Sequence, residues 1–277
     1  MNCCNIIDKL HSLFYTLPLA EQRVAAEILS DTDKIQHISI SELAESAKVS
    51  DATVTRLCRR LSLSGFYSFK IELAKATADK TAKETEGEPK SVIGESMKES
   101  FKAIEMAGKA LSEESIERVV CLFESAERIL CIGTGGGAIA AEECAHLFSL
   151  VSNKFITVRD LHIQFTALAG MKKNDVLLLF SYSGATKSGL ELLALAKKLG
   201  VHTVLVSAFS KSPLGKESDE ILFCGATEAP TEIGSVGARM AMLTVSDVLY
   251  RVFIHRNKKS ADEYRSTVSE AIAERHL

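Results

Sequence analysis

Short, continuous apolar runs alternate with helical stretches throughout the second half of this chain. The clearest runs cover residues 128–132, 155–158, 176–180 and 203–206, and residues 221–223 form a fifth, weaker one. Strands that are buried on both faces lack an alternation of polar and apolar residues, and parallel strands need long, usually helical, connections between them. The pattern therefore predicts an α/β fold in which helices cover both faces of a parallel sheet.

The first 80 residues show a different pattern, in which only helices are expected. Residues 19–29 and 39–47 predict two short helices, and Ser50 is a suitable N-cap for a third helix over residues 51–61. In this third helix the apolar side chains recur at helical spacing, at Val54, Leu57, Cys58 and Leu61. The chain thus combines an all-helical part with an α/β part.

A polar segment with one proline and two glycines separates the two parts. It spans residues 81–96, and its composition is typical of a boundary between domains. The length of 277 residues is sufficient for two domains. We expect a helix-turn-helix domain over residues 1–80, a linker over 81–96 and an α/β domain over 97–277.

Residues 47–50 join two of the predicted helices with the spacing of a helix-turn-helix. The second helix would enter the major groove of double-stranded DNA with its N-terminal residues toward the base edges. Hydroxyl and cationic side chains near its polar face suit contacts to phosphates and to guanine. The candidate DNA-binding residues are Ser50, Thr53, Thr55, Arg56, Arg59, Arg60 and Lys70. The alternative is the solvated face of an amphipathic helix in a small bundle.

Two loops that follow buried strands contain the groups of an anion site. The first, residues 133–137, has glycines that let backbone amides approach an anion at the start of a helix. It also fits a dinucleotide fingerprint, although Asp160 follows Gly133 by 27 residues rather than about 20. The second, residues 181–186, places two serines and a threonine around a glycine, which favours a phosphate monoester. An ordinary capped turn is the simpler interpretation of this second loop.

Both parts of the chain resemble domains of one family. The sequence ISELAESAKVSDATVTRLCRRL at 40–61 and its continuation at 65–74 resemble the N-terminal domain of the RpiR family of regulators. The second half resembles the sugar isomerase (SIS) domain, through SYSGAT at 181–186, DLHIQ at 160–164 and the glycine loop. An SIS domain that follows this particular helix-turn-helix is the arrangement of the RpiR family.

The resemblance implies a transcriptional regulator whose α/β domain is a five-stranded, flavodoxin-like sheet that senses a phosphorylated sugar. It also implies a homo-oligomer, a dimer or a tetramer, on operator DNA. The effector would be held by the hydroxyls and backbone of the two loops, with a histidine near the sugar: Gly135, Gly136, Gly137, Ser181, Ser183, Gly184, Thr186 and His162. Relatives often carry serine where this chain has Gly137, so we expect one side-chain contact to be absent and the sugar specificity to differ.

A sugar-phosphate isomerase or etherase with an accessory helical domain is the main alternative. Such an enzyme needs a base beside the carbon-bound proton and an acid at the carbonyl oxygen. The residue types are present at Glu142, Glu143, Glu228, Glu232 and His162, but their spacing singles out no base. The helix-turn-helix also gives catalysis no evident purpose. A dinucleotide-dependent redox sensor is a third interpretation.

Composition places the chain in the cytoplasm. The seven cysteines are scattered without CxxC spacing, and several occupy apolar positions that suit reduced thiols. The N-terminal residues do not read as a signal peptide, and the apolar runs are far shorter than the roughly 20 residues of a membrane helix. The net charge of −3 is compatible with DNA binding, because residues 50–75 carry five cationic side chains and two carboxylates. No metal or cofactor is expected.

Overall fold

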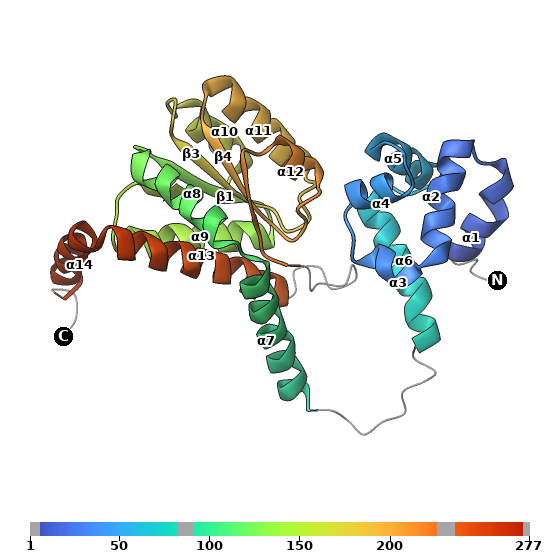
Figure 1. Ribbon diagram of the computed structural model, residues 1–277, viewed down its shortest axis with the longest axis horizontal. Coiled ribbons are helices and arrows are strands. Elements are labelled where there is room, and N and C mark those ends of the chain that lie inside the picture. The colour runs from blue at the N-terminus through green and yellow to red at the C-terminus, as the bar shows by residue number, and fades with distance from the viewer. Residues whose placement is uncertain (1–5, 82–90, 226–235, 274–277) are drawn as a thin grey trace. The chain divides into compact units, whose positions relative to one another are not determined.

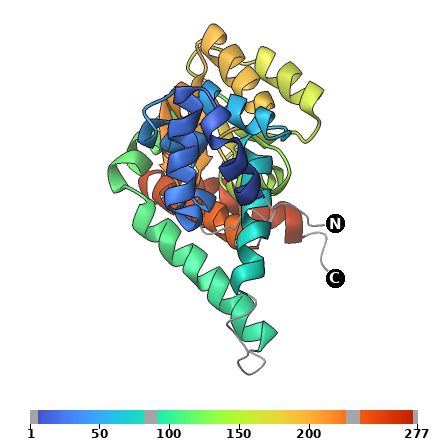
Figure 2. The same ribbon diagram turned by 90° about the vertical axis from the view of Figure 1, so that its right-hand side faces the viewer.

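The computed structural model describes residues 6–81, 91–225 and 236–273, which form two compact units (Figures 1 and 2). One unit lies within residues 1–98, and the other comprises residues 99–226 and 236–277. Most of the expected linker falls outside the described residues, but its last part is helical, because α7 runs from Val92 to Ala110. Ser91 begins this helix, since its carbonyl accepts a hydrogen bond from the amide of Glu95. The helix therefore starts at residue 92, within the segment that was expected to be a linker.

The first unit is entirely helical in its described residues, as predicted. Its helices are α1 (Ile6–Leu13), α2 (Leu19–Ser30), α3 (Thr32–Gln36), α4 (Ile40–Ser46), α5 (Asp51–Arg60) and α6 (Phe66–Thr81). Apolar side chains from most of these helices enclose one core, which includes Val24, Leu43, Leu57, Phe69 and Leu73. This core orients α4 and α5 as consecutive helices of the predicted helix-turn-helix.

The turn between α4 and α5 is closed by backbone hydrogen bonds. At the start of α4, Ser39 and Glu42 form a capping box, in which each side chain accepts a bond from the other's backbone amide. At the end of α4, the amide of Val49 donates to the carbonyl of Ala44. Lys48 adopts a φ of 53°, which lets the chain reverse direction within a short turn.

The second unit contains a five-stranded sheet in which every strand is parallel to its neighbours. The strands are β1 (Ile129–Gly133), β2 (Phe155–Thr157), β3 (Val176–Phe180), β4 (His202–Ser207) and β5 (Glu220–Phe223), in the spatial order β2-β1-β3-β4-β5. Every residue of β1 and β3 is buried, which explains their uninterrupted apolar sequences. The prediction of a parallel sheet is confirmed.

Helices cover both faces of this sheet (Figure 1). One face packs against α8 (Glu113–Ser125), α9 (Gly136–Ser149) and α13 (Val236–Arg256). The other face packs against α10 (Leu161–Ala169), α11 (Lys187–Leu199) and α12 (Pro213–Glu217). None of the described helices combines the length and hydropathy that crossing a bilayer requires.

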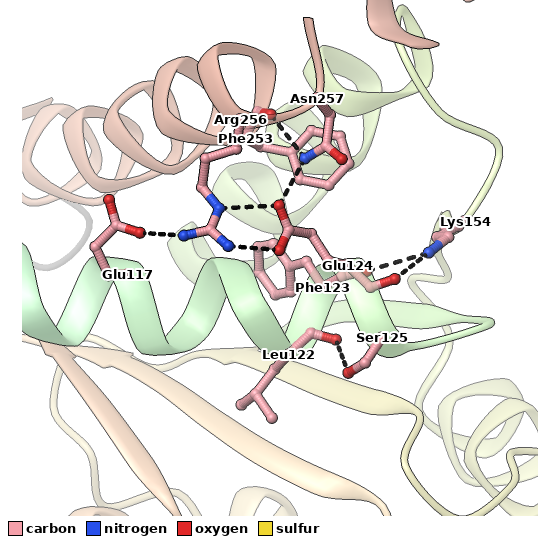
Figure 3. A network of polar contacts seen from close by, with 9 residues as sticks. All are labelled: Glu117, Leu122, Phe123, Glu124, Ser125, Lys154, Phe253, Arg256 and Asn257. Carbon is pink, nitrogen blue, oxygen red and sulfur yellow. Dashed lines mark hydrogen bonds and ion pairs between the residues drawn. The ribbon is translucent and has the colours of Figure 1, made fainter. Parts of the chain in front are cut away.

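A polar network fixes the C-terminal end of α13 against α8 (Figure 3). The guanidinium of Arg256 donates to both carboxylate oxygens of Glu124, at 2.9 and 2.8 Å, and to Glu117 at 2.6 Å. The side-chain amide of Asn257 also donates to Glu124, at 2.9 Å. Lys154, in the loop before β2, donates to the backbone carbonyls of Phe123 and Glu124. The chain then continues as α14 (Lys258–Ala273).

Candidate functional site

The two predicted anion-binding loops begin at adjacent strand ends. β1 ends at Gly133 and β3 ends at Phe180, and these two residues are partners in the sheet register. The strand order reverses between β1 and β3, because β2 lies on the outer side of β1. Ligands of open α/β sheets bind at such a switch point, outside the C-terminal strand ends. The sheet therefore brings residues 133–137 and 181–186 to one crevice-forming edge.

The glycine loop packs against β3 through its backbone. A Cβ atom at Gly133 would lie 2.6 Å from the carbonyl carbon of Gly137 and 2.7 Å from the carbonyl oxygen of Phe180. A Cβ atom at Gly137 would collide with the same Phe180 carbonyl oxygen. Gly135, at a φ of 56°, makes the turn into α9. From the sequence, Gly137 was expected only to lack the hydroxyl that a serine would supply. In the structure, the absence of a side chain at Gly137 permits this close approach to Phe180.

The hydroxyl loop contains a buried polar atom that lacks a partner. Ser181 is 6% exposed, and its Oγ makes no hydrogen bond to any described residue. Ser183 and Thr186 are half-buried in the same loop, and Thr186 is the N-cap residue of α11. A buried hydroxyl without a partner costs free energy, unless a ligand supplies the missing hydrogen bond. Ser181 is therefore the residue whose environment most directly suggests a bound polar group.

Gly184 seats the hydroxyl loop on the segment that follows β4. Its φ is 60°, and a Cβ atom there would lie 2.6 Å from the Cβ of Ser212. The carbonyl of Gly184 accepts a hydrogen bond from the amide of Leu214. α9 and α11 both begin at this edge of the sheet, so their first backbone amides add donors for an anion. Hydroxyls, amides and two helix N-termini together suit a phosphate monoester.

The structure places His162 at the same edge but in an exposed position. His162 lies in the first turn of α10, which follows β2, and Asp160 caps that helix through the amide of Ile163 at 3.0 Å. Its proximity to a sugar stays a prediction.

Residue-by-residue reasoning missed two further side chains near the glycine loop. Arg239, in the first turn of α13, is within 3.8 Å of the position that a Cβ at Gly136 would occupy. Gln164, which is 1% exposed, donates to the carbonyl of Gly133 at 3.2 Å, while its Oε1 has no partner among the described residues. Arg239 is more than 100 residues from the loop in sequence, so spacing could not reveal it.

Of the carboxylates that an isomerase could use, the two that the structure describes, Glu142 and Glu143, are not arranged as a base. Glu142 forms an ion pair with Arg159, and this hydrogen bond lowers the pKa of Glu142, which opposes proton abstraction near neutral pH. Glu143 is exposed on α9. Glu228 and Glu232 lie outside the described residues.

On the helix-turn-helix, Arg56 and Arg59 are exposed along α5. Arg56 Nη2 donates to Thr53 Oγ1 at 2.8 Å, and the Ser50 hydroxyl lies 3.1 Å from the same oxygen. Thr53 is itself 4% exposed, so it orients these neighbours more readily than it reaches a base. The hydroxyl of Thr55 donates to the carbonyl of Asp51.

The two remaining basic candidates are engaged within the fold. Lys70 is 8% exposed, and its Nζ donates to the Ile38 carbonyl at 3.1 Å and lies 5.8 Å from the ring centroid of Phe66. Arg60 forms an ion pair with Glu21 at 2.8 Å. Lys70 therefore has a structural role within the helical unit, and its expected phosphate contact stays a prediction. Arg60 forms the ion pair with Glu21, but its side chain is still half exposed.

Comparisons with known proteins identify the same two domains, a helix-turn-helix followed by an α/β domain. Residues 4–80 match the profile of the helix-turn-helix domain of the rpiR family, and residues 122–251 match that of the SIS domain. The Escherichia coli HTH-type transcriptional regulator HexR is 27% identical over 275 residues, which cover 98% of this chain and 95% of HexR. An uncharacterised HTH-type transcriptional regulator of Caldanaerobacter subterraneus is 29% identical over 263 residues, 93% of each chain.

A solved structure resembles almost the whole chain. It is that of the Vibrio vulnificus NanR protein complexed with ManNAc-6P, with a TM-score of 0.89 and 24% sequence identity. The match covers 99% of this chain and 100% of the other. At this identity the likeness establishes the shared fold.

Proposed function

We propose that this chain is a transcriptional regulator of the RpiR family. It binds operator DNA through α5, and a phosphorylated sugar at the β1–β3 edge changes its DNA affinity. The observation that carries the ligand proposal is the buried hydroxyl of Ser181, which has no partner among the described residues and lies at the sheet edge where α9 and α11 begin. The NanR structure supports the proposal, because that protein of the same fold was complexed with a sugar phosphate.

The DNA-binding surface is formed by the exposed residues at the N-terminal end and along one side of α5. Arg56 and Arg59 would contact bases or phosphates, with Ser50 and Thr55 at the start of the helix. A homodimer, or a homotetramer built from such dimers, would present two copies of α5 to half-sites about one helical turn apart or a multiple of it. The protein would act in the cytoplasm, where its operator lies.

The effector would act by shifting a population. A ligand changes DNA affinity only if it binds one conformation of the protein better than another. The side chain of Arg239 and the backbone of residues 133–137 are at the site, so an anion there contacts elements of both the sheet and α13. In this proposal the protein is not an enzyme: Glu142 is held by Arg159, and the site binds its ligand without converting it.

A thermal-shift panel tests the ligand proposal. The phosphorylated form of the effector should raise the melting temperature, while the free sugar at the same concentration, NAD and NADP should have no effect. The polar groups of the site would be left unpaired without the phosphate, so discrimination should be steep. Equal stabilisation by free and phosphorylated sugars, or stabilisation by a dinucleotide, would contradict the proposal. Exchange of solvent deuterium into the bound sugar phosphate would instead reveal an isomerase.

A further inference from the structure

One face of α7 carries large apolar side chains that no other described helix of the second unit covers. Ile93, Met97, Phe101 and Ile104 are 74, 53, 63 and 42% exposed. Their spacing of three or four residues places them on one stripe of the helix. The neighbouring face holds α7 in place, since Ala103 and Ala107 are buried in the core of the second unit. Figures 1 and 2 show α7 extending beyond the helices that cover the sheet.

Such a stripe is unusual on a monomer, because contiguous exposed apolar surface generally marks an interaction site. We propose that a second copy of this chain covers it, with the two α7 helices packed antiparallel about a two-fold axis near Phe101. This proposal rests on the homo-oligomer proposed above and is independent of the identity of the effector.

The stripe is complementary to itself in this register. A two-fold axis near Phe101 brings Met97 to within about one residue, along the helix, of Ile104 of the second copy, so that each apolar side chain meets another one. The same axis brings Ile93 to within one residue of Gly108. A Cβ atom at Gly108 would meet no described atom within 4 Å, so the space beside it is open to a large side chain. The stripe thus contains large apolar side chains and, at Gly108, an open space in which a large side chain of the second copy can fit.

The charges beside the stripe fit the same register. Lys98 and Glu105 lie on the same flank of α7, and both are exposed. In an antiparallel pair that flank faces its own copy, so with the axis near Phe101 the Lys98 side chain of each chain lies within about one residue of Glu105 of the other. Within one chain Glu105 bonds Lys109 at 2.6 Å on the outer side of the helix, which leaves its flank accessible. A parallel pair would not produce this match of opposite charges.

The first test replaces the central residue of the stripe. Phe101→Glu should weaken self-association by on the order of tenfold or more, because it places two carboxylates at the two-fold axis. Lys102→Glu, one residue further and off the stripe, should leave it unchanged. Sedimentation velocity over a concentration series measures both, and circular dichroism checks that Phe101→Glu, at a position that is 63% exposed, leaves the secondary structure intact.

The second test uses the flanking charges. Lys98→Glu and Glu105→Lys each make two like-charge contacts across the axis, and each should weaken self-association by roughly three- to thirtyfold. Mixing the two variants should restore association, because every contact in the mixed pair is again between opposite charges. Circular dichroism of each variant checks that α7 remains helical.

Two failures can be distinguished. A wild-type chain that is monomeric at all concentrations would refute this contact together with the proposed homo-oligomer. A wild-type dimer that is insensitive to Phe101→Glu, or charge variants that do not associate preferentially when mixed, would overturn the α7 contact alone and leave the proposed function standing.

Discussion

The guanidinium of Arg60 and the carboxylate of Glu21 are joined by an ion pair of 2.8 Å that connects the end of α5 to the start of α2. The two side chains are unequally exposed: that of Glu21 is 4% exposed and that of Arg60 is 50% exposed. Loss of the ion pair would therefore cost more free energy at the buried carboxylate of Glu21 than at the half-exposed guanidinium of Arg60. Arg60, on the basic side of α5, thus also stabilises the helical unit.

Arg60→Ala should lower the stability of the helical unit, because it leaves the buried carboxylate of Glu21 without its cation. We expect a loss of about 1–2 kcal/mol, below the usual cost of breaking a fully buried pair because Arg60 is half exposed. Arg59→Ala, the exposed neighbour, should change stability by less than about 0.5 kcal/mol. Urea denaturation measures both. Equal effects would show that Glu21 does not need the pair.

DNA affinity should depend on Arg56 and Arg59. Each alanine variant should lose about 1–3 kcal/mol if the arginine reads a base, or lower the salt slope by about one if it contacts a phosphate. Lys75→Ala, on the exposed side of α6 and paired with Glu72, serves as the control. Fluorescence anisotropy with operator DNA at several salt concentrations makes the measurement. A folded double variant, Arg56→Ala and Arg59→Ala, with unchanged affinity would place the DNA-binding surface elsewhere.

Ser181→Ala should have opposite effects on the free and the liganded protein. The free protein should be unchanged or more stable by about 1 kcal/mol, because a buried hydroxyl without a partner is removed. Affinity for the sugar phosphate should fall by about 1.5–3 kcal/mol, the value of a hydrogen bond to a charged group. Ser183→Ala should lower affinity without stabilising the free protein. Calorimetry and denaturation together separate the two effects, and a destabilised Ser181→Ala protein would contradict the ligand role.

Gly137→Ser should disturb the site rather than restore a contact. The new side chain would collide with the carbonyl oxygen of Phe180, so the glycine loop would have to move away from the end of β3. We expect a loss of about 1–3 kcal/mol in stability, typical of overpacking, together with weaker effector binding. Gly136→Ala is the matched control, because its nearest neighbour would be the Arg239 Cγ at an ordinary 3.8 Å. A gain in effector affinity for Gly137→Ser would show that the loops can accommodate the hydroxyl.

The network around Glu124 should contribute to stability in a pH-dependent way. Hydrogen bonds from Arg256, and then from Asn257, lower the pKa of Glu124 below its ordinary value. A carboxylate whose pKa is lower in the folded state stabilises the fold above its unfolded pKa, about 4.3, and this stabilisation is lost as the pH falls through the lowered value. Glu124→Gln should therefore reduce stability near pH 7 more than near pH 3.

The main elements of the fold could be predicted because their signals are local. The apolar sequence at 176–180 is buried along its whole length as β3, and the helical spacing of Val54, Leu57 and Cys58 is the buried face of α5. The start of α7 was missed, because Ser91 caps a helix in a segment whose glycines and proline suggested a linker. Local patterns were thus sufficient wherever burial followed the period of a single element.

The candidate site residues were predicted from side-chain type, which does not reveal their tertiary partners. Side-chain type indicated that Arg60 and Lys70 belong to a basic surface, but their partners Glu21 and Ile38 are 39 and 32 residues away in sequence. The approach of Gly137 to Phe180 also joins segments that only the sheet brings together. Interactions of this kind depend on tertiary packing, which the period of one helix or strand does not encode.

The contact between the backbones of Gly137 and Phe180 also bears on the thermodynamics of ligand recognition. The glycine loop and the end of β3 touch without intervening side chains and have little freedom to move apart, so this part of the proposed anion site is formed before a ligand arrives. Binding would then lose little conformational entropy, and more of the interaction energy would be realised as affinity. A conformational response to the proposed effector would therefore be carried by segments that touch the ligand from outside the glycine loop.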